Sequence, residues 1–299
     1  MQLFINRFIT LCFLLTSYFL VAQNEIAYYP PDWTFKNTID VVDYSQIKTM
    51  TKEVFEIDEN KEYPFSKEYW SWNNTYQLTD YRFINQPMKE MSFDVRINYT
   101  NPNGNQIKTI TIFNTVKEKM IEERQYSYGS FNVDKIVVKR YLLNTNPDVF
   151  EVTYQGNDND YIKETVFTSN KKISSQTKSW YNYATKSLKK EYYKENIKTP
   201  VETEHLKFDA LQKPLERTIG NLGVTTTTKY NYKSRKVEVF GDETDYKELI
   251  NIEKDSEPYQ KFEYEYDDNY NWIVRKTYQM KNNKWLYTTI TKRTITYKN

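Results

Sequence analysis

The chain has 299 residues, with 42 basic and 40 acidic side chains and a formal net charge of +2. Basic and acidic residues are interspersed, as in Lys189-Lys190-Glu191, so the sequence has no segregated basic face and we expect no nucleic-acid partner. Tyrosine occurs 28 times, whereas only ten leucines and three alanines follow residue 22. Because strand-forming residues outnumber strong apolar helix formers, the composition predicts an all-β protein.

Residues 1–22 have the pattern of a secretory signal peptide. Arg7 supplies the positive charge, Phe8 to Val21 is mostly apolar, and Ala22 is a small residue at the expected cleavage point. We therefore expect an exported protein, located in the periplasm, at the cell surface or outside the cell. No later segment is apolar enough to predict a membrane span. The one cysteine, Cys12, lies inside the signal segment, so we expect no disulfides and no thiolate site.

Residues 23–75 form a leading segment of different character. It contains Tyr29-Pro30-Pro31 and a strand predicted from Ile47 to Ile57. We expect this segment to lead into a sheet and to cap its first edge, since a bare edge strand invites pairing with other chains.

Residues 76–299 repeat a pattern of strand, polar turn and strand. Aromatic residues recur in it at intervals of 26, 29, 25, 24 and 34 residues, at Tyr128, Tyr154, Tyr183, Phe208, Tyr232 and Tyr266. Such spacing predicts an antiparallel sheet built from a repeated β unit.

The last predicted hairpin runs from Trp272 to Met280 and back from Trp285 to Tyr297. Threonines and charged residues occupy both faces of the returning strand, so neither face reads as a continuous dry core. The same mixture excludes an outer-membrane barrel, which needs an apolar residue at every second position across the bilayer. The mean hydropathy of −0.84 also argues against a lipid-facing barrel.

The segment Tyr264 to Arg275, with Tyr264-Glu265-Tyr266-Asp267 at its start, resembles a YD (Rhs-type) repeat. Phe208 to Arg217 resembles a degenerate second copy, and residues 47–56 resemble the opening strand of exported YD-repeat-like proteins of Bacteroidetes type. Tyr270 replaces the glycine of the usual repeat. The resemblance implies an antiparallel sheet that curls into an open shell or half-barrel and serves as a scaffold, with no active site of its own.

Residues with chemical potential are few. The one histidine, His205, stands in a strand-like run, where a sheet-surface position is the simpler reading. Asp158-Asn159-Asp160 and Asp267-Asp268-Asn269 have oxygen ligands that calcium uses, but they also suit tight turns. We find no catalytic motif, and we expect no enzyme activity, cofactor or metal.

Aromatic side chains are the remaining candidates for ligand binding. Trp70, Trp72, Tyr264, Trp272 and Trp285, together with Tyr69, are able to stack on sugars or to pack the sheet. The sequence thus favours a non-enzymatic binding or scaffold module of the cell envelope, with an unknown protein or glycan partner. Two alternatives stay open: a carbohydrate-binding or carbohydrate-active protein that uses an aromatic platform, and a partner or shell for a toxin.

Overall fold

The computed structural model describes residues 46–298 apart from 60, 76, 101–105, 130–132, 142–145, 158–160, 169, 196, 212 and 240–241. The expected signal peptide, Cys12 and the acidic run at 158–160 lie outside the described residues. In the described part of the chain, no helix has the length and apolarity needed to cross a membrane.

The described elements are eighteen strands and one short 3₁₀ helix, η2 (Lys89–Met91). The first nine strands are β1 (Ile47–Asp58), β2 (Lys61–Trp72), β3 (Leu78–Asn85), β4 (Phe93–Tyr99), β5 (Ile107–Asn114), β6 (Lys119–Tyr128), β7 (Val133–Arg140), β8 (Asp148–Asn157) and β9 (Tyr161–Phe167). The others are β10 (Ile173–Asn182), β11 (Ser187–Lys194), β12 (Glu202–Phe208), β13 (Pro214–Asn221), β14 (Val224–Val239), β15 (Asp242–Lys254), β16 (Glu257–Tyr266), β17 (Trp272–Lys281) and β18 (Lys284–Tyr297).

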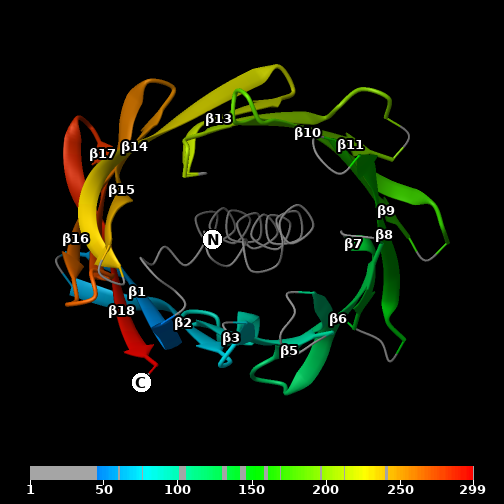
Figure 1. Ribbon diagram of the computed structural model, residues 1–299, viewed down its shortest axis with the longest axis horizontal. Helices are drawn as coiled ribbons and strands as arrows, with labels where there is room; N and C mark the ends of the chain where they lie inside the picture. Colours follow the sequence, from blue (N-terminus) through cyan, green and yellow to red (C-terminus); the bar gives the residue numbers. More distant parts are fainter. Residues whose placement is uncertain are drawn as a thin grey trace.

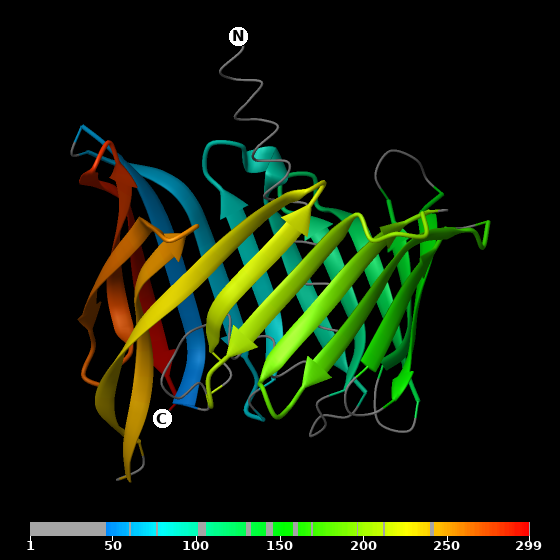
Figure 2. The same ribbon diagram turned by 90° about the horizontal axis from the view of Figure 1, so that it is seen from above.

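Each strand pairs antiparallel with its neighbours in the chain, and β1 also pairs with β18. The sheet therefore closes into a barrel (Figures 1 and 2). The predicted all-β antiparallel architecture is confirmed, and the curl expected from the resemblance proceeds to full closure. Residues 47–72 of the leading segment form β1 and β2, and β1 covers the edge of β18.

The aromatic spacing corresponds to one hairpin per interval. Tyr128, Tyr154, Phe208, Tyr232 and Tyr266 lie on β6, β8, β12, β14 and β16, and Tyr183 directly follows β10. The recurring unit is thus a pair of strands, and each anchor marks the next even-numbered strand.

Three turns that follow even-numbered strands share one hydrogen-bond pattern. In each, the Oδ1 atom of the first residue accepts bonds from the backbone N–H groups two and four positions later, at 2.8–3.0 Å; the first residues are Asn73, Asp209 and Asp267. The last two turns belong to the segments that resemble YD repeats. An Asx side chain that satisfies its own turn explains these acidic positions without a ligand.

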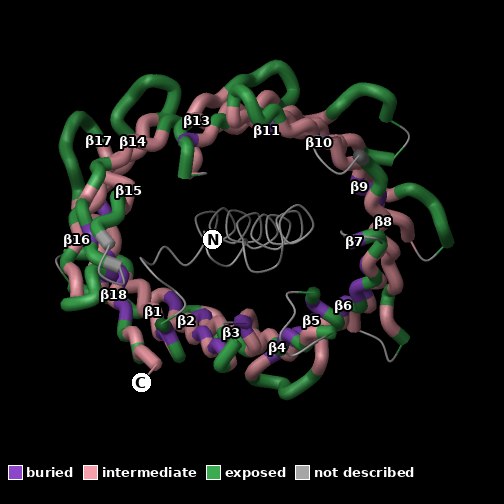
Figure 3. Tube along the Cα trace, viewed as in Figure 1, coloured by how far each residue is buried: buried purple, intermediate pink, exposed green. Residues whose placement is uncertain are grey.

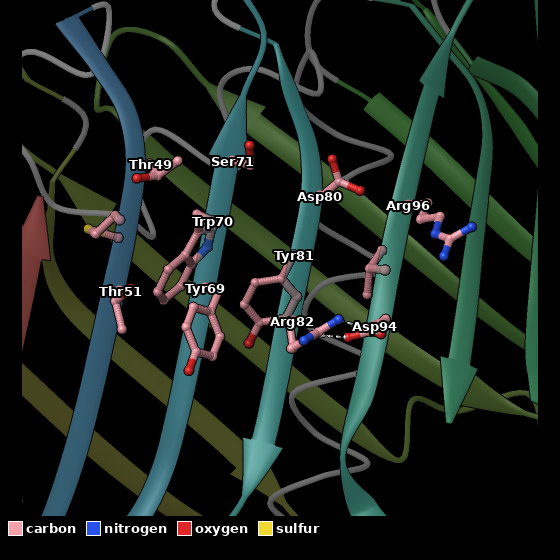
Figure 4. A pocket seen from close by; sticks show the side chains of 12 residues that line it. Thr49, Thr51, Tyr69, Trp70, Ser71, Asp80, Tyr81, Arg82, Asp94 and Arg96 are labelled. Carbon is pink, nitrogen blue, oxygen red and sulfur yellow. Dashed lines mark hydrogen bonds and ion pairs between the residues drawn. The ribbon is translucent and has the colours of Figure 1, made fainter. Parts of the chain in front are cut away.

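Backbone bonding and stereochemistry distinguish the two faces of the wall. Thr115 N–H donates to Ser92 O, so alternate residues counted from Ser92, including Asp94 and Arg96, direct their backbone groups towards β5. Figure 4 looks from outside, with the far wall behind, and there β4 rises with the next strand on its right. When an L-residue lies on a rising strand and its backbone N–H and C=O groups point to the right, its side chain points at the viewer. Asp94 and Arg96 therefore face outward, and the register extends this assignment around the barrel.

The main hydrophobic core lies on the inner wall. Ile97, Ile110, Ile112, Ile136 and Val138 alternate with outward residues and are 3–5 % exposed. Buried positions gather mainly along the arc from β1 to β6 (Figure 3).

The outer wall is polar and carries ion pairs between neighbouring strands. Examples are Glu53–Lys67 at 3.0 Å and Lys135–Glu151 at 2.7 Å. A barrel that faces lipid needs an apolar outer band instead. The charged face of the closed barrel is thus its outer one.

Candidate functional site

A groove on the outer wall crosses β1, β2, β3 and β4 (Figure 4). Its volume is about 420 Å³, which is within the range of small-ligand sites. The register aligns two rows of outward side chains along its sides. One row is Thr49, Ser71, Asp80 and Arg96, and the other is Thr51, Tyr69, Arg82 and Asp94. The strand backbone between the rows forms the floor.

One end of the groove is charged. Arg82 donates from Nε to Asp94 Oδ1 at 2.6 Å and from Nη2 to Asp94 Oδ2 at 3.2 Å, a bidentate pair. Asp80 and Arg96 stand opposite each other in the adjacent row, and the Arg96 guanidinium lies 4.9 Å from the Phe113 ring centroid. Positive and negative groups therefore alternate around this end, so it offers both donors and acceptors.

The other end carries short hydroxyl side chains and one ring. Thr49, Thr51 and Ser71 are half-buried, and Tyr69 stands beside Thr51 in the register. The Lys67 ammonium lies 5.2 Å from the Tyr69 ring centroid. Each hydroxyl group is able to donate one hydrogen bond and to accept others, and the tyrosine ring adds a flat apolar face.

The five aromatic candidates do not form one platform. Trp70 and Trp72 share the inner face of β2, at 9 % and 5 % exposure, and Trp70 packs against Tyr81 with ring centroids 5.2 Å apart. Both tryptophans belong to the core cluster. Their alternation with Ser71 instead directs Tyr69 and Ser71 into the outer groove.

The remaining three candidates are separated from those two. Trp272 is 5 % exposed on the inner wall, with Tyr264 in edge contact at 6.0 Å between centroids. Trp285 starts the return of the last hairpin and is 37 % exposed. That hairpin matches its prediction closely, since β17 and β18 begin and end within one residue of the expected strands.

His205 and the acidic turn show no arrangement for catalysis or metal binding. His205 is exposed on β12, opposite Lys189 and Thr218 on the outer wall. Asp267 is engaged by its own turn and also accepts a hydrogen bond from Tyr297 Oη. Among the described residues, no group of three or more His, Cys, Asp or Glu side chains is placed to hold a metal ion.

In the groove, the hydrogen bond with Asp94 raises the pKa of Arg82, and two buried carboxyl groups of the inner wall also have shifted pKa values. Burial alone would raise the pKa of Glu122, but Arg124 and Arg140 lower it, with nitrogen–oxygen distances of 2.5 and 2.7 Å. Burial raises the pKa of Glu164 to about 7, and a hydrogen bond from Tyr154 offsets part of that rise. The two carboxyl groups are remote in sequence from the groove.

The sequence alone does not point to four of the groove residues, namely Asp80, Arg82, Asp94 and Arg96. Their signal is a repeated pattern: β3 and β4 both carry Asp-x-Arg, and because the two strands are antiparallel each aspartate lies opposite an arginine. This pattern is recognisable only when the pairing register of β3 with β4 is known.

Comparison with known proteins yields no family. No protein-family model matches the chain, and no curated protein matches it. Among solved structures, a porin-like protein from Bacteroides uniformis shows 10% identity and a TM-score of 0.43, covering 84% of this chain and 96% of that chain. A porin-like protein from Bacteroides vulgatus shows 11% identity and a TM-score of 0.34, covering 82% and 97%. Neither match is close enough to transfer a property to this chain.

Proposed function

We propose that the protein is an exported, non-enzymatic β-barrel that binds a glycan in the outer groove across β1 to β4. The observation that carries the proposal is the two-row arrangement, with hydroxyl groups at one end, paired charges at the other and the Tyr69 ring between them. Sugars present many hydroxyl groups and apolar ring faces, and this combination complements both.

The polar outer wall supports a role in an aqueous exported compartment. Its charged side chains are paired across strands, as at Lys139–Glu123 and Lys207–Glu216. A glycan in the periplasm or at the cell surface would reach the groove directly from solvent, because both rows point outward.

Binding accounts for the groove better than hydrolysis. Glycoside hydrolysis needs one carboxyl group to protonate the leaving oxygen and a second to assist attack. Both oxygens of Asp94 accept bonds from Arg82, which occupies that carboxylate in an ion pair. The same pair is well suited to fix the orientation of a hydroxyl-rich ligand.

Retention on a panel of immobilised polysaccharides tests the proposal. The wild-type protein should bind at least one glycan without releasing sugar, and Tyr69→Ala should weaken that binding by about tenfold, because it removes the ring face. Tyr193→Ala is the matched control. Tyr193 is also an outward tyrosine, with the Lys178 ammonium 4.5 Å from its ring centroid, but it stands on β11, away from the groove.

Equal loss in both tyrosine variants would contradict the groove assignment. Failure of the wild-type protein to retain any glycan would contradict the glycan itself, and sugar release would contradict the non-enzymatic role.

A further inference from the structure

The two ends of the barrel differ in the apolar side chains that they expose. Turns from odd- to even-numbered strands form one end, the upper edge in Figure 2, and turns from even- to odd-numbered strands form the other. Among the described residues, nine exposed large hydrophobic side chains lie in or beside the first set of turns, and four lie beside the second. The first set of turns is named the apolar rim.

Leu222 is the most exposed of these side chains, at 91 %, and it lies at the tip of the β13–β14 turn. Its φ angle is 48°, and Gly223 follows with a φ of 82°. The next two turns of the rim have the same positive φ angles, but there the residues are Asp255-Ser256 and Asn282-Asn283. A bulky side chain is uncommon at such a φ, and small polar residues or glycine suit it better. A contact outside the chain therefore explains Leu222 better than the turn itself does.

Lysines accompany the apolar side chains of this rim. In four of its turns an exposed hydrophobic residue is adjacent in sequence to an exposed lysine: Val116-Lys117, Lys172-Ile173, Ile197-Lys198 and Lys284-Trp285. In the described part of the chain, these four lysines form no ion pair. None of the four exposed hydrophobic residues at the opposite end has a lysine neighbour in sequence. Glu118 and Glu195 share two of the rim turns, so the positive charge is moderate and the apolar side chains should supply most of the binding.

We propose that the apolar rim docks on the surface of an anionic phospholipid bilayer. Leucine, valine and tryptophan side chains would insert at the boundary between lipid and water, where the tryptophan ring is favoured, and the lysines would lie near the lipid phosphates. The hydrophobic side chains stand on separate turns around the end of the barrel. Insertion into a fluid surface suits this spacing, whereas a protein partner needs one continuous complementary patch.

Docking at this rim leaves the outer groove accessible. Thr49 and Ser71, which line the groove, lie near the start of β1 and the end of β2, and both positions are close to the opposite end of the barrel. The proposed membrane contact is therefore separate from the proposed glycan site.

Flotation with lipid vesicles tests the proposal, with vesicles of phosphatidylcholine alone and vesicles of phosphatidylcholine mixed with phosphatidylglycerol. We expect the wild-type protein to float with the mixed vesicles, less with the neutral ones, and less again when added salt screens the lysines. Leu222→Asn should weaken binding to the mixed vesicles by about tenfold, because it removes the most exposed apolar side chain. Asparagine suits a positive φ, so this variant should be as stable as the wild type.

Leu211→Asn is the matched control. Leu211 is 50 % exposed in a turn at the opposite end, so its replacement should leave vesicle binding unchanged. Lys284→Gln should weaken binding to the mixed vesicles by about fivefold and leave binding to neutral vesicles unchanged.

The proposal would be overturned if the wild-type protein did not float with the mixed vesicles, or if the two leucine variants lost binding equally. A dimer in solution that dissociates in Leu222→Asn, without vesicle binding, would assign the rim to a second copy of the chain instead. Glycan retention by Leu222→Asn should match the wild type, so failure at the rim is distinguishable from failure of the outer groove.

Discussion

The inner wall has two arcs with the same strand topology, one stabilised mainly by apolar packing and the other by polar contacts. On β4, β5 and β7 the buried inward side chains are largely aliphatic, as at Ile97, Ile110 and Val138, and β6 between them adds the Glu122–Arg124 pair. From β9 to β13 the buried inward positions include Glu164, Thr177, Ser179 and Glu204. Antiparallel pairing of neighbouring strands continues through both arcs. Strand pairing therefore determines the barrel architecture, and the two arcs differ in the interactions that stabilise their inward side chains.

The polar arc contains a connected network in place of a dry core. Glu204 Oε1 accepts a bond from Arg217 Nε at 2.5 Å, and Glu204 Oε2 accepts one from Tyr192 Oη at 2.9 Å. Lys190 lies 3.6 Å from the same carboxylate. Burial alone would raise the pKa of Glu204, but Lys190 and Arg217 lower it. The network is thus sensitive to charge, whereas the aliphatic arc is sensitive to volume.

The largest effect is expected from Ile110→Ala in the aliphatic arc. Ile110 is 3 % exposed, so the substitution should leave a cavity and lower the free energy of unfolding by about 4 kcal/mol, with little dependence on pH. Urea denaturation measures the loss. Thr111→Ala, outward on the same strand, should change stability by less than about 0.5 kcal/mol. Similar losses in both variants would mean that this arc is not a packed core.

Glu204→Gln should cost about 3 kcal/mol in the polar arc, because it leaves Arg217 and Lys190 without their shared counter-ion. The matched control is Glu216→Gln, which breaks an exposed pair with Lys207 on the outer wall and should cost less than about 1 kcal/mol. Denaturation of both variants at pH 7 gives the comparison. An equal cost at the two sites would show that the inner pair is solvated like the outer one.

Glu164→Gln should produce the smallest effect and change how stability varies with pH. Because the folded-state pKa of about 7 is above the unfolded value, the folded state holds its proton more tightly. The wild-type protein should therefore lose stability as pH rises from about 4.5 to about 7, by about 2 kcal/mol relative to the variant. Urea midpoints across this range measure the difference. Parallel pH profiles would contradict the raised pKa.

Much of the fold was predictable because its signals are local. The last hairpin follows from Trp272 to Tyr297 and its polar turn, and the spacing of the aromatic anchors corresponds to the length of one hairpin. Closure of the sheet into a barrel was not predictable from such local signals. β1 and β18 are far apart in sequence, and the mixed polarity of both strand faces does not specify a partner.

The candidate site was harder to predict because it depends on register. The sequence points to Tyr69 through its tryptophan neighbours, but the groove forms only where β2 aligns Tyr69 with Arg82 and Ser71 with Asp80 on β3. A shift of one residue would exchange inward and outward side chains. A bulge between Ser71 and Trp72 adjusts that alignment, and local sequence patterns do not locate such irregularities.

Among the described strands, β1 and β18 form the pairing of longest sequence separation. Every other pairing joins strands that are adjacent in the chain, so hairpins can form as they are synthesised, but the wall has two bare edges until β18 is available. Long-range pairing is slow, and exposed edges pair readily with other chains. Assembly of this barrel is therefore limited by a single late event, and its most aggregation-prone species is a nearly complete sheet that has not yet closed.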